Sequence, residues 1–476
     1  MSNDKQKPTD VSRRKFVGTV ATAAGYTIVP RHVLGGVGFQ APSDTVNVGV
    51  VGYAHGMGTT NLLNMAKSDN IVALCDCDES TAAKEARKRR NTSSDKFPKA
   101  TEYKDFRVML EKQKDIDAVL VATPDHTHAV VAMAAMQLGK HVYVQKPLTR
   151  TVSEARALTE AARKYKVVTQ MGNQGHSEEG LRLMQEWLEA GALGQVREVY
   201  CWTNRPIWPQ GMPRPTETVA VPDGMDWDLW IGPAPMRPIQ KTYHPFGWRA
   251  WQDFGAGAMG DMGCHVMDAA FTILKLGAPT SVLATLAYNF LPPAPGARGY
   301  GQRVEYNDSY PPSSVIHLSF PARGNMAPVK MHWYDGGLLP ELPDDLEPNR
   351  KLPESGTIFV GEKGKMWCET YSESPRLIPE TFMQAFQRPP RTLPRVPDGR
   401  SGHEKNWLDA IRQKGQAVSS FDYAGPFTES VLLGNVALRY PGVRLLWDAP
   451  NMKVTNMPDA DQFVNHNYRA GWSLST

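Results

Sequence analysis

The chain has 476 residues, of which 41% are hydrophobic and 21% are charged, and its formal net charge is +4. This composition is typical of a soluble globular protein of two to three domains, and it excludes a chain that is mainly disordered. The excess positive charge lies in residues 1–43, with six Lys or Arg and two acidic residues, so the remainder is neutral. A neutral body argues against nucleic acid as the partner.

The first predicted element is a targeting segment. Residues 12–30 read SRRKFVGTVATAAGYTIVP, with the pair Arg13–Arg14, then Phe16 and a mildly apolar run. This order resembles a twin-arginine export signal, with Val17 where leucine is usual. The apolar run is too short and too weak to span a membrane stably. We expect residues 1–43 to be a signal and linker and the protein to be periplasmic; the alternative is a basic tail with a chance arginine pair.

Residues 44–79 then predict a strand, a glycine turn, a helix and a second strand. Such a β-α-β unit holds a dinucleotide diphosphate at its first turn. Gly52, Gly56 and Gly58 are spaced G-x-x-x-G-x-G, which looks like the G-x-G-x-x-G fingerprint with one inserted residue. Asp76 ends the second strand, where a carboxylate would bind the ribose hydroxyls of NAD and repel the 2′-phosphate of NADP. The alternative is an ordinary strand-to-helix turn followed by a turn aspartate.

Residues 115–165 continue the alternation of strand and helix, which predicts a parallel, doubly wound sheet. TPDHTH (123–128) and QKP (145–147) fall at the carboxyl ends of strands, where ligands bind in such sheets. The basic run KEARKRRN (84–91) reads as the solvated end of a helix, although Arg87 and its neighbours leave NADP possible. The cofactor contacts expected from these two motifs are Thr123, Pro124, His128, Gln145 and Lys146.

Three stretches are similar to the glucose–fructose oxidoreductase / inositol dehydrogenase family, often written Gfo/Idh/MocA. They are ATPDHTHAVVAMAAMQLGKHVYVQKPLT (122–149), GDMGCHVMD (260–268) and YAGPFTESVLLGNVALR (423–439). The resemblance covers most of residues 44–476. It implies an α/β protein with an N-terminal Rossmann domain (44–172) and a C-terminal α+β domain (173–476). The second domain would carry an open, mainly antiparallel sheet for substrate binding and for contacts in a homo-oligomer, a dimer or tetramer.

The resemblance also implies an activity, the transfer of a hydride between NAD(P) and a hydroxyl carbon of a sugar, glycoside or cyclitol. The family's E-K-P lysine falls on Lys146, and its D-x-x-x-H pair falls on Asp261 and His265. Gln145 stands where the family usually has Glu, which removes a charge near the nicotinamide. A base must take the hydroxyl proton near neutral pH, and histidine suits that task, so we assign it to His265. Lys146 would stabilise the developing alkoxide, and Asp261 would orient the imidazole or bind a substrate hydroxyl.

Each of these residues has a structural alternative. Asp261 could cap a helix, His265 could be a core histidine, and Lys146 could be a surface lysine. A metal site made from Asp261, His265, Asp268 and His244 is disfavoured because no zinc-type spacing appears, so we predict no metal. The five cysteines are scattered and form no C-x-x-C pattern.

The substrate side falls in residues 201–251, which hold six of the twelve tryptophans. Flat aromatic rings suit the apolar faces of sugars. We expect substrate contacts from TYHPFGWR, namely Tyr243, His244, Trp248 and Arg249, whereas Trp227 and Trp230 read as core. Two other functions remain open: NAD-dependent glycoside cleavage through transient oxidation at C3 and elimination, and a non-catalytic sugar-binding module. Free NAD is not expected outside the cytoplasm, so we expect NAD, with NADP possible, to be tightly bound.

Overall fold

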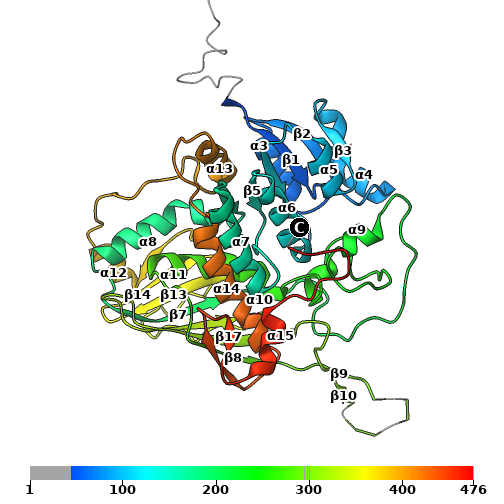
Figure 1. Cartoon of the computed structure of the whole chain (residues 1–476). Helices are drawn as coiled ribbons and strands as arrows, with labels where there is room; N and C mark the ends of the chain where they lie inside the picture. Colours follow the sequence, from blue (N-terminus) through cyan, green and yellow to red (C-terminus); the bar gives the residue numbers. More distant parts are fainter. Residues whose placement is uncertain (1–43, 294, 297, 300, 475–476) are drawn as a thin grey trace, which may run out of the picture. The chain divides into compact units, whose positions relative to one another are not determined.

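The computed structural model describes residues 44–293, 295–296, 298–299 and 301–474 (Figure 1). The expected export signal lies outside these residues. The chain from Val46 to Thr476 forms one compact unit. No helix within the described ranges is both long enough and apolar enough to cross a membrane.

The N-terminal part is a six-stranded sheet in the order β3-β2-β1-β4-β5-β6, and every pairing is parallel. Its four central strands, β2, β1, β4 and β5, are nearly continuous apolar runs, because helices cover both faces of a parallel sheet. The order reverses between β1 and β4, and such a switch point is where these sheets bind ligands. The strands are β1 (Asn47–Val51), β2 (Asn70–Cys75), β3 (Thr101–Tyr103), β4 (Ala118–Val121), β5 (His141–Val144) and β6 (Thr169–Met171).

The connecting helices confirm the predicted alternation of strand and helix. The longest, α7, begins at a capping box in which the Glu154 carboxylate accepts the backbone N–H and the hydroxyl of Thr151. α6 is apolar on all sides and almost entirely buried. The helices are α3 (Met57–Met65), α4 (Thr81–Arg89), α5 (Phe106–Lys112), α6 (Asp125–Gln137) and α7 (Val152–Tyr165), with the short 3-10 helix η2 (Ser94–Lys96).

The C-terminal part is built on a nine-stranded sheet in the order β15-β14-β13-β7-β12-β11-β8-β16-β17. Only the β7–β12 pairing is parallel, which confirms the expected open, mainly antiparallel sheet. β11 alternates buried and half-buried residues, as a sheet with one covered face requires. The strands are β7 (Val196–Trp202), β8 (Ser281–Leu286), β11 (Ser314–Phe320), β12 (Val329–Tyr334), β13 (Gly356–Gly361), β14 (Lys365–Glu369), β15 (Arg376–Ile378), β16 (Arg444–Asp448) and β17 (Lys453–Val454). A separate hairpin pairs β9 (Phe290–Leu291) with β10 (Gln302–Arg303).

The late helices join the two parts. α14 (Phe421–Ala437) packs against both α7 and α10 (Gly257–Val266). α13 (His403–Ile411) packs against α3, and its Trp407 is buried in the core under the first sheet. The remaining helices are η3 (Gln174–Ser177), α8 (Glu179–Glu189), α9 (Trp227–Ile231), η4 (Gly247–Ala250), α11 (Asp268–Ile273), α12 (Glu380–Ala385), η5 (Gly399–Gly402), η6 (Pro458–Ala460) and α15 (Asp461–Val464).

A separate aromatic core lies beneath the loops between β7 and α10. Trp227 and Trp230 stack there with ring centroids 4.6 Å apart, as the reading of these residues as core predicts. Tyr243 is fully buried in the same cluster, against the rings of Trp251 and Phe254. This cluster supports the chain segment that runs from His244 to Arg249 along one wall of the candidate site.

Candidate active site

A cavity of about 360 Å³ opens at the carboxyl ends of β1, β2, β4 and β5. This volume lies within the range of small-molecule sites. One wall is the first sheet with its glycine turn, and the other comes from residues 244–249 and α10. Twelve of the predicted site residues line it: Gly52, Gly56, Gly58, Asp76, Thr123, Pro124, Gln145, Lys146, His244, Trp248, Arg249 and Asp261.

The turn between β1 and α3 has the geometry of a phosphate cradle despite its altered spacing. Gly52 has φ +84°, and a Cβ there would lie 2.7 Å from the carbonyl oxygen of Ala122. A Cβ on Gly58 would lie 2.1 Å from the carbonyl oxygen of Gly52, so this turn has no room for a side chain. Gly56 is the N-cap of α3 and offers no side-chain cap, so it leaves the first amides of α3 available for an anion. The turn therefore fits a dinucleotide diphosphate.

Asp76 has two roles in this geometry. Its Oδ2 accepts the backbone N–H groups of Tyr53 (3.1 Å) and Ala54 (3.0 Å), and its Oδ1 accepts the N–H of Asp78 (3.0 Å). The carboxylate thus fixes the glycine turn, which corresponds to the alternative role considered from the sequence, that of a turn aspartate. It also lines the cavity, and a carboxylate oxygen can accept more than one hydrogen bond, so ribose hydroxyls remain a possible second partner.

The basic run after β2 is the largely exposed end of α4, as predicted, with Arg87 as the exception among its charged residues. Arg87 is 3% exposed rather than solvated, because its guanidinium donates to Glu79 (2.6 Å) and to the Tyr53 hydroxyl (3.2 Å). Arg90 is the residue of this run that lines the cavity, and it donates to the carbonyl oxygen of Gly56 (3.1 Å). The positive charge beside the glycine turn therefore comes from Arg90.

Lys146 and Asp261 form the centre of the site. The Lys146 ammonium lies 2.8 Å from both the Asp261 carboxylate and the Asp261 backbone carbonyl. Arg249 Nε lies 3.6 Å from the same carboxylate oxygen. Burial opposes ionisation of Asp261, but Lys146 and Arg249 outweigh it and lower the pKa of the carboxyl to about 2. The Asp261 carboxylate is therefore ionised, and it holds the ammonium group at the cavity wall.

His265 follows one turn later on α10 but does not line the cavity. Its ring packs edge-on against Tyr371, with centroids 4.7 Å apart. Its buried Nδ1 has no hydrogen-bond partner among the residues that the structure describes. Burial, reinforced by the charge of Lys146, holds the pKa of His265 well below its usual value, so the imidazole is neutral. A buried nitrogen without a partner is costly to a fold and calls for a functional explanation.

Asp125 is a site residue that the sequence reasoning did not single out. It is the first residue of α6, lines the cavity, and accepts the backbone N–H of Ala256 (3.0 Å). Burial raises the pKa of its carboxyl to about 7, although Arg249 and Lys146 act in the opposite direction. A carboxyl that titrates near neutral pH is a candidate acid or base. The TPDHTH motif marked its position, but only the folded structure reveals its burial.

Two predicted site residues support the cavity from outside it. His128 is buried, with its ring nitrogens 2.9 Å from the carbonyl oxygens of Pro147 and Thr123. It thereby positions both motifs that line the cavity, and it does not itself reach the cavity. Tyr243 was predicted to contact substrate, but it belongs to the aromatic core beneath the cavity wall and does not line the cavity.

The metal ligands considered from the sequence do not converge. Asp268 accepts from His176 (3.0 Å) and from Asn173 (3.1 Å), and it does not line the cavity. His244 contacts Asp78 (2.8 Å) instead. Asp261, His265, Asp268 and His244 therefore do not come together as one set of ligands.

The fold and the cavity define a class of protein, an α/β protein with two sheets and a dinucleotide-type glycine turn. Residues 46–173 match the family model for the oxidoreductase family, NAD-binding Rossmann fold. Residues 199–286 match the model for the C-terminal alpha/beta domain of the same family. Both matched segments therefore resemble the Gfo/Idh/MocA oxidoreductase family, and together they cover less than half of the chain.

The chain is also similar to known relatives in sequence and to solved structures in fold. Levoglucosan dehydrogenase of Pseudarthrobacter phenanthrenivorans is 27% identical over 186 residues, which are 38% of this chain and 39% of that enzyme. An uncharacterized oxidoreductase of Escherichia coli, YdgJ, is 23% identical over 77% of this chain and 92% of its own length. The structure of levoglucosan dehydrogenase in complex with NADH and levoglucosan has a TM-score of 0.53 at 18% identity, covering 84% of this chain and 99% of that one. The last comparison shows the fold alone.

The raised pKa of Asp125 predicts a specific dependence of stability on pH. Between about pH 4 and pH 7 the folded state holds a proton on this carboxyl that the unfolded state has released, so this group makes stability fall as pH rises through that window. Asp125→Asn removes the effect and keeps an oxygen that can accept the Ala256 N–H. Relative to the wild type, the variant should gain up to about 1.4 kcal/mol of unfolding free energy per pH unit across the window.

The measurement is urea unfolding of both proteins at pH 4.5, 5.5 and 7.5. Since all other titrating groups are shared, only the difference between the two proteins matters. A difference that stays constant with pH would show that Asp125 is ionised throughout the window.

Proposed function

We propose that this protein is an NAD-dependent oxidoreductase that transfers a hydride to or from a hydroxyl carbon of a sugar, glycoside or cyclitol. The observation that carries the proposal is the single cavity that joins the glycine turn and Asp76 to the Lys146–Asp261 pair. The family's NAD-binding domain and the similarity to levoglucosan dehydrogenase support it.

The chain's own residues divide the work of holding the cofactor. The glycine turn and the amino end of α3 would bind the diphosphate, and Asp76 would bind ribose hydroxyls. Thr123, Pro124 and Gln145 border the same cavity, and Gln145 is fixed by donating to Asn61 (2.8 Å). When bound, NAD supplies the hydride acceptor or donor.

Lys146 and its partner prepare the substrate oxygen for proton loss. The ammonium has three N–H donors and uses two of them on Asp261, so one remains for a ligand oxygen in the cavity. A fixed cation at that oxygen stabilises the negative charge that develops when the hydroxyl proton leaves. Asp261 keeps the ammonium oriented and offers its carboxylate to a neighbouring hydroxyl.

Two groups can receive the proton. His265 is neutral and has a free nitrogen, but it does not reach the cavity in this structure. Asp125 lines the cavity and titrates near pH 7. We keep His265 as the base and place Asp125 as the second acid–base group. If Asp125 were the base instead, Asp125→Asn would abolish turnover and His265→Asn would leave the pH profile of kcat unchanged.

The same pair of groups favours a second candidate function. Glycoside cleavage through transient oxidation at C3 needs one base for the C3 hydroxyl and another for the C2 proton before the aglycone leaves. His265 and Asp125 supply two such groups near Lys146. Release of free sugar from a glycoside, with no net change in NADH, would favour this function over net oxidation.

The substrate wall carries a cation and aromatic rings. The guanidinium of Arg249 lies over the Trp248 ring, 4.2 Å from its centroid, and both residues line the cavity with Trp230. Aromatic faces beside a hydrogen-bond donor suit a carbohydrate ring. A sugar-binding module without catalysis would have no need for the buried Lys146–Asp261 pair, so we rank that function last.

Lys146→Met should lower kcat/KM for the best sugar substrate by about 10²–10³-fold, because it removes the cation at the reacting oxygen. Binding of NADH should change far less, since the glycine turn and Asp76 are untouched. The measurement is initial-rate kinetics on a panel of sugars and cyclitols, with NADH affinity from fluorescence. The matched control is Lys112→Met on the exposed side of α5, which should keep wild-type rates. Wild-type kcat/KM in Lys146→Met would contradict the assignment.

We further propose that the protein is exported through the twin-arginine route with its dinucleotide bound. The support is the order of residues 12–30, together with the need for a retained cofactor outside the cytoplasm. Changing Arg13 and Arg14 together to Lys should leave the protein in the cytoplasm, whereas the wild type should reach the periplasm with about one NAD(H) per chain. Cell fractionation followed by mass analysis of released nucleotide is the measurement. An unchanged location of the double variant would reject the export signal.

A further inference from the structure

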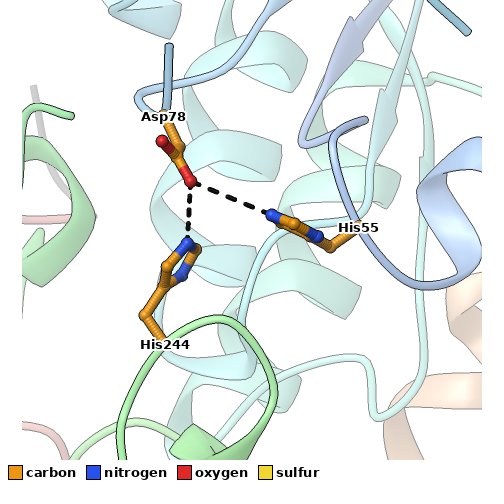
Figure 2. A group of neighbouring side chains, drawn as sticks. All are labelled: His55, Asp78 and His244. Atoms are coloured by element: carbon orange, nitrogen blue, oxygen red, sulfur yellow. Dashed lines mark hydrogen bonds and ion pairs between the residues drawn. The ribbon is translucent and has the colours of Figure 1, made fainter. Parts of the chain in front are cut away.

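Three side chains from separate loops meet at the edge of the cavity, close to the glycine turn. His55 lies in that turn, Asp78 follows β2, and His244 lies in the turn segment 241–246 that precedes η4. Figure 2 shows the two imidazole rings pointing at one oxygen of the carboxylate. The His244 Nε2 is 2.8 Å and the His55 Nε2 is 3.8 Å from Asp78 Oδ2. The ligand atoms of all three residues lie within 4.8 Å of one another.

Hydrogen bonding explains only one of these two contacts. A distance of 2.8 Å is a normal hydrogen bond from His244, but 3.8 Å is too long for one from His55. Ligand atoms that bind Zn²⁺ tetrahedrally at 2.0–2.1 Å lie about 3.3 Å apart. The two observed distances bracket this value, and the third separation, between the two histidines, is at most 4.8 Å, so small movements of the side chains would bring the three atoms around one ion.

The surroundings hold Asp78 as a ligating carboxylate is usually held. It is 3% exposed, and its other oxygen accepts the N–H of Ser80 (3.0 Å). Arg87 donates to the backbone carbonyl of Asp78, not to the carboxylate. Asp78 also forms a β-bridge with Met225, which ties the loop after β2 to the C-terminal part of the chain. Fixing a ligand from outside the metal in this way is typical of metal sites.

Unlike the buried Asp78, the two histidines are partly exposed. Their side chains are 29% (His55) and 16% (His244) accessible, and both line the cavity. Any ion held by the three residues would therefore have its remaining coordination positions directed into the cavity. Two imidazoles and one carboxylate with an open position are the ligand set of many catalytic zinc sites and of related transition-metal sites. Within the described part of the chain, no other group of three such side chains has this convergence.

We propose that His55, Asp78 and His244 bind one divalent ion of the kind that imidazole favours, Zn²⁺ or Co²⁺, with an open position facing the cavity. The ion would fasten the segment around His244 to the dinucleotide-binding domain, because the other two ligands belong to that domain. It would also place a positive charge beside the glycine turn, where an anionic oxygen of a bound ligand could complete its coordination. The proposal rests on these three side chains and does not depend on the proposed oxidoreductase function.

Cobalt is a suitable probe because tetrahedral Co²⁺ absorbs visible light. Full-length protein without a polyhistidine tag would be stripped with a chelator, dialysed and titrated with Co²⁺, and its metal content would be measured by mass spectrometry. The wild type should bind one ion per chain with a visible band. His55→Ala, Asp78→Asn and His244→Ala should each weaken binding by at least about tenfold.

The matched control is His332→Ala. His332 Nδ1 lies 2.6 Å from His317 Nδ1 across β11 and β12, and this pair is the other place where two imidazoles could attract the ion. The control should bind Co²⁺ like the wild type. A wild type that binds no Co²⁺, or binding that survives all three cluster substitutions, would overturn the proposal, and so would binding lost only in His332→Ala. Circular dichroism of the same samples shows whether a variant that loses Co²⁺ is still folded. Their NADH affinity shows whether the dinucleotide site is intact, so failure of the metal site and failure of the dinucleotide site can be told apart.

Discussion

The buried contact between Lys146 and Asp261 is the interaction on which the site depends. Lys146 follows a strand of the first sheet and Asp261 lies on a helix of the C-terminal part, so their 2.8 Å contact joins the two halves across the cavity. Removing either partner would leave a charge in a poorly solvated place, which is far more costly than the pair itself is stabilising. Burial is the main cause of the shifted pKa values of His265 and Asp125, and the same contact adds to both, because Lys146 opposes protonation of His265 and Asp261 favours protonation of Asp125.

The glycine turn shows how a changed spacing can preserve a function. One extra residue between the first and last glycines leaves both close backbone approaches intact, at Gly52 and at Gly58. Asp76 stabilises the longer turn by accepting two of its amides, and this explains how the insertion is tolerated. The extra length also carries His55 to the edge of the cavity, within reach of Asp78. The longer glycine turn thus contains a side chain, His55, that the regular fingerprint does not require.

Much of the fold and part of the site could be predicted from the sequence. Apolar strands alternating with helices indicated the parallel sheet, and local motifs located the glycine turn and Lys146, because such signals depend on neighbouring residues. Burial is not revealed by such signals: Arg87 looked solvated and Tyr243 looked available, yet both are buried in the folded chain. Asp125 titrates near neutral pH only because tertiary packing desolvates it. The contact between Asp78 and His244 spans 166 positions of the sequence, so no spacing pattern could have revealed the cluster.

The central claim is that the glycine turn holds a dinucleotide, and calorimetric titration of the protein with NADH tests it most directly. The wild type should bind NADH at one site per chain. Gly58→Ala should bind at least about tenfold more weakly, since its Cβ would displace the backbone of the cradle. Gly139→Ala also adds a Cβ at a glycine of positive φ (+72°), but there it would meet nothing within 4 Å, so this control should bind NADH like the wild type even if backbone strain lowers its stability. A wild-type protein that binds neither NADH nor NADPH, or a Gly58→Ala variant with full affinity, would contradict the account.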